Sequence, residues 1–379
     1  MAVAMSVGRA NYTWIGYSSR EKTNCTDHLL MRGLAAPPTL YVSSRHLWAS
    51  EPGGGPLART IITAMTPLRT CVAVVVACAS VIAHGGDQAV GAAVRYLGQA
   101  PPGSTPVRFA PDVVSTPAIE INGVFRPDFR EFFFARRVGD VFTLFRSTLN
   151  GTRWSAPQAL SIFPGGASGV AVDMAYSPDG RELYFLGRFK PGVPPNEAPL
   201  DIWVTRYKDG RWATAEVVPA PISTDAFEGY PTVVADGSLY LASDRPGGLG
   251  RSDIYRARRR PDGGFDAPVN LGAPVNSTAT EGDTFASPDE RYLIITAARD
   301  DGFGKADLYV SFRAADGRWG PPVNLGNTIN TADTEFCPMV TPDGRYLFFS
   351  RKYGGDTWET TTDAEVFWVD MAVVERLRR

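Results

Sequence analysis

A unit of about fifty residues recurs five times in the second part of the chain, and this repeat restricts the fold more than any other feature. Each copy carries a turn centred on an aspartate, and successive aspartates are 51, 57, 53 and 54 residues apart. A proline before and a glycine after the aspartate favour a tight turn, in which the aspartate bonds nearby backbone. The five aspartates are Asp128, Asp179, Asp236, Asp289 and Asp343.

Each turn is followed by a run of aliphatic and aromatic residues, such as 183–186 and 346–349, and then by a second β-rich segment that begins with an acid. Nearly continuous apolar runs indicate strands that are buried on both faces, as when each sheet packs between two others. The acids that begin the later strand are Asp140, Asp201, Asp253, Asp307 and Glu365.

One such unit cannot bury both faces of its sheet, so five units in a ring are expected. An aromatic residue followed by proline ends most units, and a spare copy, Phe109-Ala110-Pro111, precedes the first. An N-terminal strand that completes the last sheet would close the ring and remove its exposed edges. The repeat therefore predicts an all-β, five-bladed β-propeller of four-stranded antiparallel blades, closed by an N-terminal strand.

These motifs allow a resemblance to be stated. The Pro-Asp-Gly turn, the Asp-Ile-Tyr strand start at 253–255 and the Gly-x-Trp-x-x-Pro ending at 317–322 resemble the WD40-like propeller repeats of the TolB type. The Gly-rich loop at 244–250 is similar to loops of exported members of that family. The resemblance covers about residues 107 to 370, and it implies envelope partners but no particular activity.

The N-terminal region has the features of an export signal. Arg69 precedes an apolar run from Cys71 to Ala83, which is too short to span a membrane. We expect residues 1–64 to be a non-native or disordered extension, 65–83 a signal peptide, 84–106 a linker, 107–370 the propeller and 371–379 a tail. The mature protein is then periplasmic or secreted, and Cys78 is an alternative site for a lipid anchor.

Charge and composition exclude several kinds of function. A net charge of −2 makes nucleic acid an unfavourable partner. The three histidines all precede the repeats, which excludes a Ser-His-Asp triad or a histidine-built zinc site within them. We therefore expect no metal and no cofactor, and a monomer.

Carboxylates are the candidate site residues. A glutamate lies eight residues before the turn aspartate in four of the five units, as Glu120, Glu228, Glu281 and Glu335, and Ala171 replaces it in the second. Asp173 and Asp283 both lie two residues after this position, in the second and fourth units. Equal registers of a propeller form rings about its axis, so these acids are expected at one mouth of the channel.

Two interpretations of the glutamates remain open. They either bond the backbone and the Ser or Thr hydroxyl of their own unit, or they raise one another's pKa and attract a cation, an amine or a sugar. The break at Ala171 favours a functional role. Trp358, near Asp356 and Glu359, is a further candidate because an exposed tryptophan near acids suits carbohydrate or peptide, with packing over the blade edge as the alternative.

We expect a binding role without catalysis, with an envelope protein or an envelope glycan held at the channel mouth. The rival function is a glycoside hydrolase that uses inner-strand carboxylates. Two carboxylates about 5 to 9 Å apart beside an open pocket would favour hydrolysis. Carboxylates that are all bonded within the fold would favour binding.

Overall fold

The computed structural model describes residues 92 to 378. The predicted extension 1–64, the predicted signal peptide 65–83 and the candidate anchor Cys78 lie outside these residues. Among the described residues, no helix is long and apolar enough to cross a membrane.

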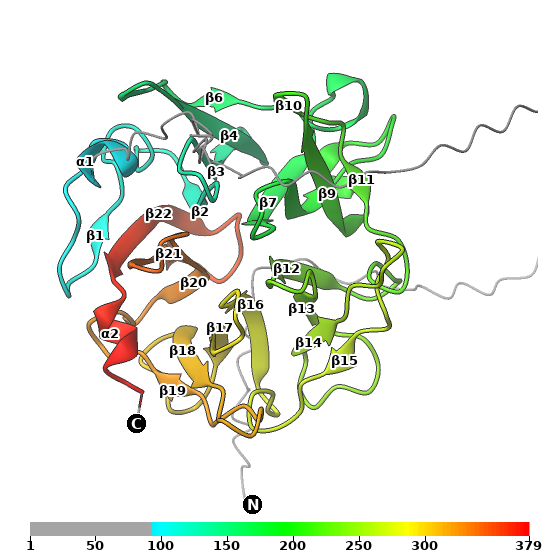
Figure 1. Cartoon of the computed structure of the whole chain (residues 1–379), viewed down its shortest axis with the longest axis vertical. Helices are drawn as coiled ribbons and strands as arrows, with labels where there is room; N and C mark the ends of the chain where they lie inside the picture. Colours follow the sequence, from blue (N-terminus) through cyan, green and yellow to red (C-terminus); the bar gives the residue numbers. More distant parts are fainter. Residues whose placement is uncertain (1–91, 379) are drawn as a thin grey trace, which may run out of the picture. The chain divides into compact units, whose positions relative to one another are not determined.

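Five antiparallel sheets stand around one axis, and Figure 1 shows their innermost strands nearest the centre. The innermost strands are β2 (Glu120–Phe125), β7 (Val170–Tyr176), β12 (Glu228–Val233), β16 (Thr280–Ala286) and β20 (Thr334–Val340). Each of them contacts the next, and β20 contacts β2 again, so the ring of sheets is closed. The fold is therefore the predicted five-bladed propeller.

The remaining strands follow outward in sequence order in each blade. The second strands are β3 (Glu131–Val138), β8 (Glu182–Arg188), β13 (Leu239–Ser243), β17 (Tyr292–Ala298) and β21 (Tyr346–Gly354). The third strands are β4 (Val141–Asn150), β9 (Leu200–Lys208), β14 (Asp253–Ala257), β18 (Asp307–Phe312) and β22 (Thr361–Asp370). Short outer strands complete the sheets, namely β5 (Arg153–Trp154), β6 (Gln158–Ala159), β10 (Arg211–Trp212), β11 (Glu216–Val217), β15 (Val269–Asn270) and β19 (Val323–Asn324).

The turn between the first and second strands has the same construction in every blade. The side chain of each turn aspartate accepts a hydrogen bond from the backbone N–H two residues later, at 2.8 to 3.4 Å. Phe129 and Glu290, which replace the usual glycine, still take positive φ values of 57° and 54°. The aspartate and its backbone bond therefore maintain the turn where glycine is missing.

Each innermost strand also contains a bulge at one common position. Two residues lack ladder partners there, so the strand bends and its side chains are redirected. The shifts lie between Ile121 and Val124, Val172 and Ala175, Gly229 and Thr232, Glu281 and Thr284, and Phe336 and Met339.

The N-terminal segment lies beside the last blade. β1 (Val107–Arg108) pairs with β22, and the N–H of Phe109 donates to the carbonyl of Val366 at 2.8 Å. Phe109 is fully buried, and its ring centroid lies 4.7 Å from that of Phe348. How far this pairing holds the ring closed stays a prediction.

Short helices flank the propeller within the described residues. The helix α1 (Ala92–Arg95) lies in the predicted linker and leads to Tyr96, which is fully buried. The helix α2 (Ala372–Glu375) lies in the predicted tail, with Val374 buried. Two 3₁₀ helices, η1 (Pro164–Gly166) and η2 (Pro195–Glu197), lie in loops.

Tyr96 offers a test of whether this segment stabilises the propeller. Its hydroxyl donates to Asp343 Oδ2 at 2.6 Å. Burial alone would raise the pKa of Asp343, but hydrogen bonds from Tyr96 and Thr341 lower it below its usual value. We expect Tyr96→Phe to lower the free energy of unfolding by about 1.5–3 kcal/mol at pH 7 in urea denaturation, as for a lost hydrogen bond to a charged group.

This cost is expected to depend on pH. A carboxyl whose pKa is lowered by folding contributes stability above about pH 4, and this is lost as the pH falls through its folded pKa. The effect of Tyr96→Phe is therefore expected to shrink at acidic pH. Tyr353→Phe is the matched control, with wild-type stability expected, and an equal loss from Tyr96→Phe at neutral and acidic pH would contradict the assignment.

Candidate functional site

The four repeated glutamates are each held by a cage within their own unit. Every one of them is fully buried. Each accepts the backbone N–H of the residue four positions earlier at 2.9 to 3.2 Å, and the hydroxyl of the same residue at 2.5 to 2.7 Å. The donors for Glu120, Glu228, Glu281 and Glu335 are Thr116, Thr224, Ser277 and Thr331.

Each glutamate also forms an ion pair with one arginine of its own blade. The partners of Glu120, Glu228, Glu281 and Glu335 are Arg136, Arg245, Arg299 and Arg351, at 2.7, 3.1, 3.0 and 2.6 Å. Burial raises the pKa of Glu228 and Glu335 above its usual value, although hydrogen bonds from the neighbouring threonine and arginine partly offset this rise. This is the arrangement expected of the structural interpretation, because no carboxylate is left to bind a ligand.

The gap at Ala171 also has a structural explanation. Ala171 is buried and lies opposite Gly187, at the register where Glu120 faces Arg136 and Glu335 faces Arg351. Acid and base are thus both missing in the second blade. The indole of Trp203 donates to the carbonyl of Gly187 at 3.1 Å and packs on Phe163, so aromatic packing takes the place of the ion pair.

The residues two positions after the glutamate register form a ring on the axis. They line one small cavity of about 10 Å³, about the volume of one water. The ring consists of Asn122, Asp173, Tyr230, Asp283 and Cys337. All but Asp283 have positive φ, which is rare for residues other than glycine and is often found at functional sites.

Three members of this ring are chemically reactive groups held close together. One ligand atom from each of Asp173, Asp283 and Cys337 lies within 4.8 Å of the others. The thiol of Cys337 donates to Asp173 Oδ1 at 3.2 Å, whereas Asp283 has no hydrogen bond of normal geometry and, among the described residues, interacts only with the Cys337 thiol and nearby backbone N–H groups.

Burial dominates the ionisation of this cluster. It raises the pKa of Asp283 to about 7, and together with repulsion from Asp283 it raises the pKa of Asp173 well above its usual value. Burial and the two carboxylates also raise the pKa of the Cys337 thiol. Without a counter-ion, the cluster therefore favours the protonated forms.

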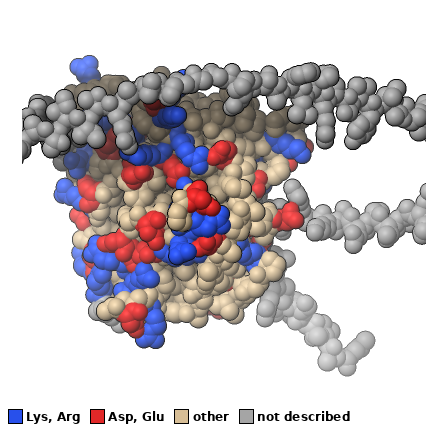
Figure 2. Space-filling view, turned by 45° about the vertical axis from the view of Figure 1, so that its right-hand side comes forward, with Lys and Arg blue, Asp and Glu red and all other residues tan. Residues whose placement is uncertain are grey.

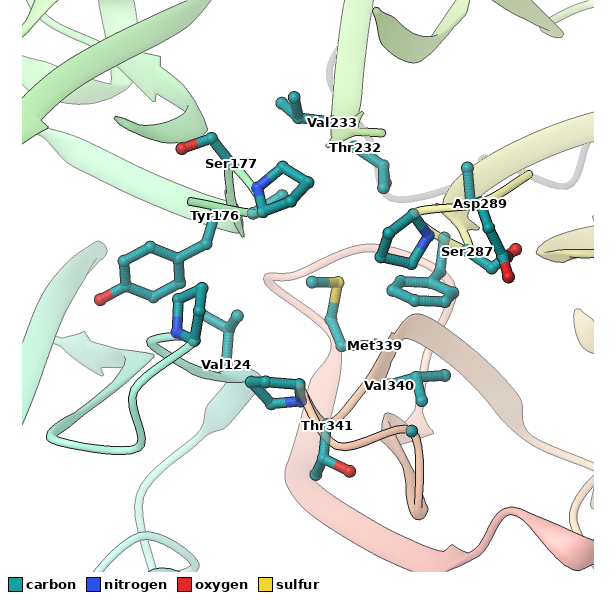
Figure 3. A pocket seen from close by; sticks show the side chains of 18 of the residues that line it. Val124, Tyr176, Ser177, Thr232, Val233, Ser287, Asp289, Met339, Val340 and Thr341 are labelled. Carbon is teal, nitrogen blue, oxygen red and sulfur yellow. The ribbon is translucent and has the colours of Figure 1, made fainter. Parts of the chain in front are cut away.

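A larger cavity lies at the opposite end of the innermost strands from the glutamates. It has a volume of about 520 Å³, and all five blades line it through the ends of these strands and the turns that follow. Figure 3 shows the Met339 side chain extending into the middle of the lining residues. Met339 also lines the small axial cavity, so one side chain separates the two spaces.

The lining of the larger cavity is mainly apolar. Three of its hydroxyl groups donate within the fold, since Ser177 and Thr341 donate to Asp179 and Asp343 at 2.6 and 2.7 Å and Thr232 donates to the carbonyl of Thr284. The apolar lining includes Val124, Phe125, Tyr176, Val233, Phe285, Tyr292, Val340, Pro127, Pro178, Pro288 and Pro342. The sequence analysis treated these prolines as turn residues only, although their shared register could have indicated a common surface.

Trp358 is not the exposed side chain that the sequence analysis considered. Only 9% of its surface is exposed, and its ring packs edge-on against Phe142 and Phe336. The ammonium group of Lys352 lies 5.5 Å from its ring centroid. Trp358 thus belongs to the core, and a ligand would have no open face of the indole to contact.

The charged surface shows no large region of one sign in the view of Figure 2, where acids and bases are interspersed. The basic cluster at 256–260 is neutralised by neighbouring acids. Arg256 pairs with Glu290 and Asp236, and Arg259 pairs with Glu182.

Comparisons with known proteins show similarity at a low level. No protein-family model matches the chain, and no curated protein matches its sequence. TolB from Acinetobacter baumannii is 13% identical with a TM-score of 0.42, over 68% of this chain and 58% of TolB.

Glycoside hydrolases are similar to the same degree. The catalytic domain of a GH62 α-L-arabinofuranosidase from Coprinopsis cinerea is 12% identical with a TM-score of 0.44, over 71% of this chain and 97% of that domain. GH43B of the Bacteroides ovatus xyloglucan locus is 12% identical with a TM-score of 0.42, over 70% of this chain and 54% of GH43B. Sequence identity and structural similarity this low do not allow a conclusion about the activity of this chain.

Substitution of one caged glutamate tests its structural role. Glu335→Gln leaves Arg351 partly buried without its charge partner, so we expect the free energy of unfolding to fall by at least about 2 kcal/mol. The double variant Glu335→Gln/Arg351→Met is expected to regain part of this loss. Chemical denaturation measures both, with the exposed Glu197→Gln as a control that leaves stability unchanged. Wild-type stability of Glu335→Gln would contradict the structural role.

Proposed function

We propose that this chain is a non-catalytic binding propeller that takes a segment of a partner protein into the cavity at the turn end of its axis. The observation that carries the proposal is the cavity of about 520 Å³ to which all five blades contribute. Its size is that of ordinary ligand pockets, and a site on the axis of a rigid ring is preformed.

The chemistry of the lining favours an apolar protein segment over a glycan. A glycan needs many hydrogen bonds at its hydroxyl groups, and the hydroxyls of Ser177, Thr341 and Thr232 already donate to groups of the fold. Valine, proline and aromatic side chains instead suit an apolar anchor residue that fills a desolvated pocket. Asp289 and Arg291 also line the cavity and could bond the polar backbone of such a segment.

The alternative function, a carboxylate-dependent glycoside hydrolase, has weaker support. The four glutamates are ion-paired. Asp173 and Asp283 lie close together, but the space beside them is about 10 Å³, which holds no sugar ring. A hydrolase also needs its two carboxyl groups on opposite sides of a bound sugar.

The setting of this activity is part of the proposal. The features of residues 65–83 support export to the periplasm or beyond, with Cys78 as an alternative lipid anchor. The repeat motifs support membership of the exported WD40-like propellers with Gly-rich loops. The partner would then be a protein of the cell envelope, bound by a monomeric propeller.

Panning of a phage-displayed random peptide library against the full chain tests the binding role. We expect selected peptides to share an apolar anchor and to bind the Val340→Arg variant at least about tenfold more weakly in fluorescence polarisation, because a buried guanidinium occupies the cavity. Pro342→Arg, at the exposed rim, is a second variant that does not disturb the core. Val138→Arg, 54% exposed at the far end of β3, is the matched control and should bind normally.

Three outcomes would contradict this proposal. One is that no peptide is selected, and another is that the selected peptides bind both cavity variants normally. The third is glycan-array binding, without peptide binding, that Val340→Arg abolishes, which would assign the cavity to a glycan. Release of the aglycone from aryl glycosides by the purified chain would favour the hydrolase.

A further inference from the structure

We propose that Asp173, Asp283 and Cys337 form a binding site on the propeller axis for a borderline-soft divalent metal ion, with zinc as the best match. The three side chains come from β7, β16 and β20, in the second, fourth and fifth blades. Their potential ligand atoms lie within 4.8 Å of one another. The site is separate from the proposed peptide cavity, which lies on the far side of Met339.

The unpartnered carboxylate of Asp283 is the observation that points to a ligand. Asp283 is 2% exposed and lines the small axial cavity, yet neither of its oxygens has a hydrogen-bond partner of normal geometry, and within the described part of the chain only the Cys337 thiol and the nearby backbone N–H groups of Asp283 and Cys337 interact with it. Buried carboxylates in proteins are ordinarily paired with a cation, hydrogen-bonded or bound to a metal. A cation in the cavity would supply the missing partner.

The glutamates on the same strands strengthen this inference by contrast. Each of the four buried glutamates has its own arginine. No lysine, arginine or histidine lines the axial cavity, although two aspartates do. On the innermost strands, the buried glutamates of one register are therefore paired with arginines, whereas two residues later Asp173 and Asp283 have no cationic partner.

The donor set selects the kind of metal. Calcium and magnesium prefer six or more oxygen ligands, whereas zinc takes four ligands and accepts sulfur together with oxygen. Two carboxylates and one thiolate are three ligands, and the second oxygen of one carboxylate would be the fourth, because a cavity of about 10 Å³ holds the ion but no water beside it. The sequence analysis excluded a zinc site built from histidine, and this set contains none.

Zinc binding requires the ligand atoms, which lie within 4.8 Å of one another, to move closer together. Ligand atoms about 2.0–2.3 Å from a tetrahedral zinc ion are about 3.5 Å apart. Cys337 Sγ and Asp173 Oδ1 are already 3.2 Å apart. On binding, the Cys337 thiol would lose its proton to solvent, and any proton on the aspartates would leave as well. The bound ion would join three blades across the axis and stabilise the ring.

Metal titration of the full chain, first freed of metal with a chelator, tests the proposal. We expect calorimetry to detect one zinc ion at this site, and the cobalt-loaded protein to show a thiolate-to-cobalt charge-transfer band. Asp283→Asn and Cys337→Ser should each weaken zinc binding by more than about 100-fold, because even outer-shell changes cost 10- to 100-fold. Zinc should raise the Tm of the wild type but not of Asp283→Asn.

Matched controls separate this site from other metal ligands of the chain. The triple variant Cys25→Ser/Cys71→Ser/Cys78→Ser removes the other cysteines, and Asp140→Asn removes an exposed acid; both should keep the site. If Cys337→Ser does not fold, the isosteric Asp283→Asn still decides. Absent zinc binding in the wild type, zinc binding unchanged in Asp283→Asn, or stabilisation by calcium but not by zinc would overturn the proposal.

Discussion

The bulge in each innermost strand is the constraint on which the centre of this molecule depends. Five strands with the same break in their ladders bring one side chain each, all at the same register, to one axis. Left-handed backbone at residues such as Tyr230 and Cys337 costs about 1–3 kcal/mol each. Identical side chains would clash or repel on the axis, which explains why this register varies while the rest of the unit repeats.

Buried acids at two neighbouring positions of the innermost strands have different partners. At the start of four of the five innermost strands, a glutamate accepts hydrogen bonds from a hydroxyl and a backbone N–H and pairs with a guanidinium, as at Glu335. On the axis, Asp173 and Asp283 face a thiol and each other. The first arrangement stabilises the blade. The second leaves two buried carboxyl groups without a cationic partner, and the blade does not need these groups for its own stability.

The repeat predicted the fold because its strongest signals are local. Each turn aspartate bonds backbone two residues away, so its role could be read from the sequence without knowledge of distant contacts. The glutamate cage was harder to predict, because its arginines lie 16, 17, 18 and 16 residues further along the chain as the hairpins differ. The axial ring was predicted only in part, because Asp173 and Asp283 were placed at one register and Asn122, Tyr230 and Cys337, which occupy the same register, were not.

The pairing of the two ends of the propeller also affects the order in which the molecule can fold during synthesis. The partner of Tyr96 is Asp343, 247 residues later, and Val107 meets Trp368 near the C-terminus. The aromatic residues Tyr96 and Phe109 thus emerge from the ribosome long before the strands that cover them. Four blades can assemble as they are made, but the seam cannot form until Phe367 and Trp368 have been synthesised, and until then Tyr96 and Phe109 lack the strands that bury them in the native structure.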